Sequence, residues 1–228
     1  MLTAESNRKL EEIFSSVGKK YGFDTVKAEY VILKDFKIRW QRSYKWADFR
    51  ISDYLEDAPD EVIIALADSI FRRILGKSDA IADELIEWVT DPDFCHRKQG
   101  IYLERSKNLT GSVIGEYKNL RDAYDRLIGA GLIPYDPDIA FSWTSYPVTR
   151  KAANCSVLMK VVSVSKVLDN EEVPDYVLDY CLYHELCHLF LGYDPSGSAH
   201  TDNFSALEQK FPTRLEAQVW LRKLYTYV

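Results

Sequence analysis

The stretch from Pro174 to Leu191 constrains the fold more than any other part of the chain. It reads as one uninterrupted helix, and apolar side chains occupy nearly every face of it. A helix that is apolar all round is buried on all sides and does not lie on a surface. We therefore expect this helix to form the centre of the core in the second half of the chain.

Two histidines and a glutamate lie inside this helix, in the sequence His184-Glu185-Leu186-Cys187-His188. Side chains four residues apart project from the same face of a helix, so both imidazoles can reach one metal ion. Neutral imidazole suits zinc, and two histidines with a third protein ligand leave a fourth position for water. Glu185 lies beside them and can act as a general base. The motif predicts a catalytic zinc site, although two core histidines bonded to backbone would also fit the helix.

A third ligand is expected downstream of the helix. His200 is the only other histidine in this half of the chain, and a loop at residues 192–197 can return it to the metal. Glu208 and Asp202 are alternatives, because carboxylates also complete such sites. The spacing alone leaves these three candidates open.

The residues around the motif resemble the SprT-like and YgjP-like zinc metallopeptidases, which are zincins of the minigluzincin type. The likeness rests on Tyr183-His184-Glu185-Leu186-Cys187-His188-Leu189 and on His200-Thr201-Asp202-Asn203-Phe204, which match HELxHL and H-x-x-x-F, and it covers about residues 139–212. It implies that His184, His188 and His200 bind zinc, that Glu185 is the general base, and that Phe204 anchors the helix behind the third ligand.

The resemblance also implies a zincin-like fold and a substrate. In related zincins an edge strand pairs with an extended peptide, and the segment Val157 to Leu168 falls at that place. The family often has a glycine and an asparagine near this strand, which are missing here, and no CxxC pair indicates a zinc ribbon. The expected activity is hydrolysis of an extended protein or peptide. A non-catalytic, zinc-stabilised protein-binding module and a protease for proteins crosslinked to DNA are the alternatives.

Hydrophobic periodicity predicts an α+β fold, with a small mixed or antiparallel sheet packed on the HExxH helix. Helices are expected at about residues 10–17, 57–76, 79–90, 117–128, 174–191, 202–210 and 213–225, and strands at 26–40, near 49–51, at 139–143 and at 157–168. We expect an N-terminal α+β region at residues 1–92, a connector at 93–115 and the SprT/YgjP-like domain at 116–228.

The two halves follow the same order of helix, strand, strand, helix and helix, which suggests an internal duplication. In the first half, Ser69-Ile70-Phe71-Arg72-Arg73 stands where the second half has the HExxH motif. This segment contains no metal ligand. We therefore expect the first half to be a degenerate zincin-like repeat.

Composition and charge indicate which binding partners and which cellular compartment to expect. The net charge of −6 makes nucleic acid an improbable partner. The longest apolar run, Val62 to Ala67, is far too short to span a bilayer, and the first residues lack the pattern of a signal peptide. Four cysteines are too few for a disulfide framework in a chain of this length. We expect a cytoplasmic protein with reduced thiols.

Overall fold

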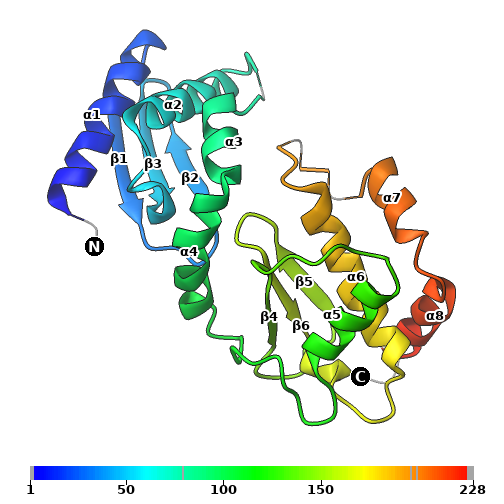
Figure 1. Cartoon of the computed structure of the whole chain (residues 1–228). Coiled ribbons are helices and arrows are strands. Elements are labelled where there is room, and N and C mark those ends of the chain that lie inside the picture. The colour runs from blue at the N-terminus through cyan, green and yellow to red at the C-terminus, as the bar shows by residue number, and fades with distance from the viewer. Residues whose placement is uncertain (1–2, 79, 196, 199, 225–228) are drawn as a thin grey trace. The chain divides into compact units, whose positions relative to one another are not determined.

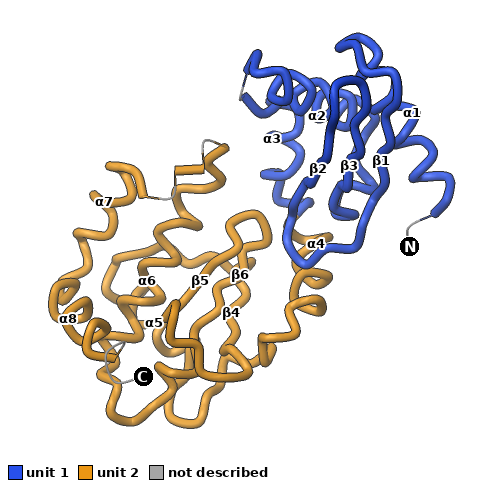
Figure 2. The backbone as a smooth tube through the Cα atoms, turned by 180° about the vertical axis from the view of Figure 1, so that it is seen from behind, with its two compact units in different colours: residues 1–94 blue, residues 95–228 orange. Residues whose placement is uncertain are grey.

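The structure, a computed structural model, describes residues 3–78, 80–195, 197–198 and 200–224. The chain divides into two compact units, residues 1–94 and residues 95–228 (Figure 2). Both units combine helices with a small mixed sheet, so the predicted α+β class is confirmed. The described part of the chain contains no helix with the length and apolar character needed to cross a membrane.

Unit 1 consists of a three-stranded sheet and the helices that pack on it (Figure 1). The sheet order is β1-β3-β2, with β1 parallel and β2 antiparallel to the central strand β3. The elements are α1 (Ala4–Lys20), β1 (Thr25–Val31), β2 (Ile38–Arg42), β3 (Trp46–Ser52), the 3₁₀ helix η1 (Asp53–Leu55), α2 (Asp60–Ile74) and α3 (Asp83–Thr90). Helix α4 (Pro92–Arg105) then spans the boundary to unit 2.

Aromatic packing fixes the helices of unit 1 against its sheet. The ring of Phe49 on β3 lies 4.9 Å from that of Phe14 on α1 and 5.3 Å from that of Phe71 on α2. Gly18 lets α1 approach closely, because a Cβ at this position would lie 2.7 Å from Val26 and 2.8 Å from Phe71. The amphipathic pattern of α1 therefore produces a tightly packed apolar layer.

Unit 2 has its own sheet, with the order β4-β6-β5. Here β4 is parallel and β5 antiparallel to the central strand β6. The elements that follow α4 are α5 (Leu120–Gly129), β4 (Ala140–Trp143), β5 (Ala153–Ser156), β6 (Val161–Val164), the 3₁₀ helix η2 (Lys166–Leu168), α6 (Asp175–Leu191), α7 (Asp202–Glu208) and α8 (Arg214–Leu224). Figure 1 shows α5 and α6 side by side against this sheet.

Helix α6 is the buried centre of unit 2, as its apolar sequence predicts. Val177, Leu178, Leu182 and Leu186 are fully buried, and α5, α7, α8 and the sheet all contact the helix. The helix ends at Leu191, and the capping residue Gly192 has a φ of 78°, in the left-handed region that favours glycine. The histidines of the HExxH motif are therefore held on a rigid element.

A single carboxylate joins the end of η2 to the start of α5. Buried Asp169 accepts hydrogen bonds from the backbone N–H groups of Glu116, Tyr117 and Lys118, at 2.7, 2.9 and 3.0 Å. A Cβ on Gly115 would collide with this carboxylate. Hydrogen bonds to a charged acceptor contribute about 1.5–3 kcal/mol each. Asp169 thus fixes the path of the chain into α5.

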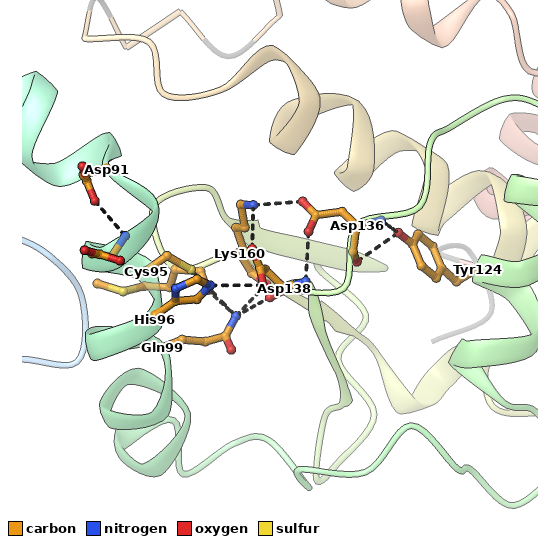
Figure 3. A network of polar contacts seen from close by, with 10 residues as sticks. Asp91, Cys95, His96, Gln99, Tyr124, Asp136, Asp138 and Lys160 are labelled. Atoms are coloured by element: carbon orange, nitrogen blue, oxygen red, sulfur yellow. Dashed lines mark hydrogen bonds and ion pairs between the residues drawn. The ribbon is translucent and has the colours of Figure 1, made fainter.

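The predicted connector at residues 93–115 is largely helical, because α4 occupies most of it. The middle of α4 is bonded to the residues that precede β4 and β6 (Figure 3). The side chain of Gln99 donates to the carbonyls of Asp138 and Met159, at 2.7 and 2.9 Å, and His96 Nε2 lies 3.1 Å from Asp138 Oδ1. Lys160 extends this network toward Asp138, at 3.6 Å. From Cys95 onward, this segment therefore belongs to unit 2.

Two strand predictions were wrong in their extent. The strand predicted at residues 26–40 is two strands, β1 and β2, which flank β3 on opposite sides, so the chain must leave the sheet between them. The strand predicted at residues 157–168 comprises a turn, the central strand β6 and η2, while β5 was missed. Period-two alternation identifies extended chain but cannot locate the crossings between strands.

The two units share one topology. In each, the first strand is parallel and the second antiparallel to the third, which is central, and a 3₁₀ helix and a long helix follow. Each long helix begins after a proline, Pro59 in α2 and Pro174 in α6. Counted from these prolines, Ser69 and Arg73 stand at the positions of His184 and His188. Duplication itself stays a prediction.

Candidate metal centre

Three histidines converge at the C-terminal half of α6. His184 and His188 lie on successive turns of this helix, and His200 comes from the segment that leads into α7. One ring nitrogen of each lies within 4.8 Å of the others, and Nε2 of His184 is 3.5 Å from Nε2 of His200. No other such group of histidine, cysteine or carboxylate side chains occurs in the described ranges.

This donor set fits zinc. Two imidazole nitrogens bound to one tetrahedral zinc ion, each at its usual bond length, lie about 3.4 Å apart. The separation between His184 and His200 is close to this value. Three imidazole ligands also leave one position of a tetrahedral ion open, as catalytic zinc sites require. His184, His188 and His200 are thus able to hold zinc.

Phe204 forms the apolar floor of the histidine cluster. Its ring is buried and lies 5.0 Å from His184, 4.3 Å from His188 and 4.7 Å from His200, measured between ring centroids. The ring of His188 is stacked on it. Phe204 therefore limits the orientations that all three imidazoles can take; its role as an anchor for α7 stays a prediction.

Glu208 orients His184 from behind. Its Oε1 atom lies 2.8 Å from Nδ1 of His184 and accepts a 2.8 Å hydrogen bond from the hydroxyl of Tyr180, which in turn accepts one from Gln218. With Nδ1 facing this carboxylate, the Nε2 lone pair is left to face a metal. Neither Glu208 nor Asp202 belongs to the ligand cluster of the described residues, whereas His200 does.

The surroundings of His188 and Glu208 shift the pKa values of these two groups so that His188 is neutral and Glu208 is ionised at pH 7. Burial, followed by the charges of His184 and His200, lowers the pKa of His188 to about 4, so this imidazole is neutral at pH 7, as a ligand must be. Burial alone would raise the pKa of Glu208. The hydrogen bonds from His184 and Tyr180 outweigh burial and lower that pKa, which keeps Glu208 ionised.

Glu185 projects from α6 toward the strand β5. Its side chain is 9% exposed, and burial raises the pKa of its carboxyl group. The charge of His184 and hydrogen bonds from the thiol and backbone of Cys155 oppose this rise. A carboxylate that is buried, bonded to a strand and beside the imidazoles is suited to accept and return a proton.

A cleft of about 780 Å³ opens in front of these residues. Its walls are formed by the segment 150–157, which includes β5, by the face of α6 that carries His184 and His188, by His200, and by residues 218–222 of α8. β5 is an edge strand of the sheet, whereas β6 is central. The prediction that Val157 to Leu168 forms an edge strand is therefore wrong, because its strand β6 is central, and β5 is the edge strand that lines the cleft.

Sequence reasoning missed three residues of this site. Tyr180 lies one helical turn before His184 and could have been found from that spacing. Gln218 and Cys155 come from α8 and β5, far from the motif in sequence, and carry no local signal. Cys187 is buried and does not belong to the ligand cluster. It packs as a small apolar side chain does.

No family model, curated protein or solved structure matches this chain. The resemblance to SprT-like and YgjP-like peptidases therefore remains a prediction drawn from the motif.

Proposed function

We propose that this chain is a zinc-dependent metallopeptidase that hydrolyses peptide bonds in extended segments of proteins or peptides. The observation that carries the proposal is the convergence of His184, His188 and His200 at the wall of a cleft that also contains Glu185. His184 is held in the tautomer that a metal requires by Glu208. This arrangement supports catalysis more than a structural role, because the site is open to a cleft.

A zinc ion held by the three histidines would supply Lewis-acid chemistry, which polarises a carbonyl group and makes water more acidic. Glu185 faces the cleft, and its carboxylate can accept a proton from the attacking water as the new bond to the carbonyl carbon forms. The same carboxyl group then returns the proton to the amine nitrogen as the C–N bond breaks. The products are a carboxylate and an amine.

Strand β5 supplies the means to hold the substrate. It lies at the edge of its sheet and lines the cleft beside Glu185. An extended peptide can add to such an edge through backbone hydrogen bonds, which fix its direction without demanding one sequence. Since Cys155 on this strand bonds to Glu185, a peptide aligned on β5 passes close to the general base.

The proposal is tested by zinc binding and hydrolysis measured on the same preparations. We expect about one zinc per chain, and cleavage of an unfolded protein that a chelator abolishes and zinc restores. His184→Ala and His200→Ala should lose both properties. His96→Ala is the matched control, because His96 is the remaining histidine of the chain and bonds to Asp138 instead. Zinc-loaded protein that cleaves no unfolded protein or peptide would overturn the proposal.

A further inference from the structure

Three lysine and arginine side chains of the described residues line the cleft. Arg150 and Lys151 line it just before β5, and Arg222 lines it from α8. Glu185 is the one acidic side chain among the described residues of the lining. The chain as a whole has a net charge of −6, so this cluster of cations contrasts with the rest of the molecule. A cleft with walls of one sign concentrates ligands of the opposite sign.

Lys151 lies next to the proposed reaction centre. Its ammonium group donates a 3.1 Å hydrogen bond to Oδ1 of Asn154 on β5, one residue before Cys155, which bonds to Glu185. The charge of Lys151 also opposes the rise in the pKa of Glu185 and contributes to the low pKa of His188. The ammonium group therefore acts on the same small volume as the catalytic groups.

The two cations at the start of β5 are not neutralised within the chain. In the part that the structure describes, neither Arg150 nor Lys151 forms an ion pair. Elsewhere in unit 2, lysine and arginine side chains do meet carboxylates, as Lys118 meets Asp175 and Arg126 meets Asp179. Arg150 and Lys151 are thus available to a carboxylate that enters the cleft.

We propose that the preferred substrates place a carboxylate one or two residues from the bond that is cleaved, against Lys151 and Arg150. This inference rests on the proposed peptidase function and names its substrate class. We place the carboxylate at this spacing because Lys151 bonds to Asn154, the neighbour of the Cys155 that bonds to Glu185, and an extended peptide on β5 advances about 3.3 Å per residue. The carboxylate comes either from an aspartate or glutamate side chain or from the free C-terminus of a peptide.

The test compares matched peptides that carry glutamate or glutamine at each position around the cleaved bond. Each peptide is made with a free and with an amidated C-terminus, which separates the two sources of the carboxylate. Zinc-loaded wild-type protein should cleave the best glutamate or free-acid peptide with a kcat/KM about 3- to 10-fold higher than its neutral match, and added salt should reduce this ratio.

Lys151→Glu should remove or invert this ratio. The ratio is the correct measure, because the variant also changes the charge beside Glu185 and so alters cleavage of both peptides. Lys107→Glu reverses an exposed charge outside the cleft and should leave the ratio unchanged. Equal kcat/KM values for acidic and neutral peptides in the wild-type protein would overturn the inference while leaving the peptidase proposal intact.

Binding gives a second measurement that does not need turnover. Fluorescence anisotropy of labelled peptides on zinc-loaded Glu185→Gln protein should show the acidic peptide binding more tightly than its neutral match. Equal affinities would overturn the inference. A lack of cleavage in the wild-type protein together with tighter binding of the acidic peptide would overturn only the peptidase function. A short single-stranded oligonucleotide could also bind this protein more tightly than any acidic peptide. That result would show that phosphate, not carboxylate, is the preferred anion, and it would overturn the inference of an acidic peptide substrate.

Discussion

Glu208→Gln is expected to weaken zinc binding without removing a ligand. The carboxylate lies 2.8 Å from Nδ1 of His184 and is itself held by Tyr180. Loss of such an outer carboxylate lowers metal affinity by about 10- to 100-fold, which corresponds to about 1.4–2.7 kcal/mol. Glutamine can still accept a hydrogen bond, so we expect about tenfold for Glu208→Gln and about 100-fold for Glu208→Ala. Tyr180→Phe should have the smallest effect, because it leaves the bond to His184 in place.

The assay is a competition titration of zinc against a fluorescent chelator, with melting temperatures measured in excess zinc to confirm folding. Glu216→Gln is the matched control, since Glu216 is an exposed glutamate on α8. X-ray absorption should count three imidazole ligands in both the wild-type protein and Glu208→Gln. If Glu208→Gln lost zinc as completely as His184→Ala, Glu208 would be a ligand. If its affinity were unchanged, the carboxylate would not orient His184.

Three further predictions concern Asp169, His188 and Cys155 of unit 2. Asp169→Ala should reduce the free energy of unfolding by about 3–5 kcal/mol in urea, because three backbone N–H groups lose a charged acceptor; this is less than the sum of three such bonds because they are only partly buried and water can replace the carboxylate, whereas Glu171→Ala should have little effect. In metal-free protein the free energy of unfolding should fall as the pH drops from 6.5 toward about 4, because His188 takes up a proton in the unfolded chain but not in the native one. Alkylation of Cys155 should be slow at neutral pH, because burial and then the charge of Glu185 raise the pKa of its thiol, and Glu185→Gln should accelerate it several-fold.

Each of these predictions has an outcome that contradicts it. Asp169→Ala with an unchanged urea midpoint would mean that the three amides find other acceptors. For the pH dependence, the wild-type slope between pH 6.5 and 4 should exceed that of His188→Gln, and equal slopes would show that burial does not hold this imidazole neutral. Cys95 is an internal control for alkylation, and a rise in its rate together with that of Cys155 would indicate loosening of the whole unit.

The helices of the site could be predicted from sequence because their signals are local. The all-round apolar pattern of α6 places it in the core, and the spacing of His184 and His188 places both on one face. His200 could be named as a candidate ligand from the same reasoning, but not separated from Glu208. The choice between His200 and Glu208 as the third ligand depends on where each side chain lies relative to His184. Only the three-dimensional arrangement shows that Glu208 faces Nδ1 of His184 instead of joining the ligand cluster.

The sheet was harder to predict because its strands are short and their partners are distant in sequence. Ala153–Ser156 is too short for a clear alternation, and it becomes a strand by pairing with β6. The longer run at residues 157–168 looked like one strand, although its first residues form a turn in which Lys160 takes a φ of 46°. Tertiary pairing, which local periodicity does not encode, decided the identity of the edge strand and hence of the expected substrate wall.

The central claim is that Glu185 activates water for peptide hydrolysis at a site formed by His184, His188 and His200. The most direct test is the rate at which zinc-loaded wild-type and Glu185→Gln proteins cleave one unfolded protein, with zinc content measured in the same samples. We predict equal zinc content and a rate reduced by about 100- to 10,000-fold in Glu185→Gln. Equal rates in the two proteins at equal zinc content would contradict the account.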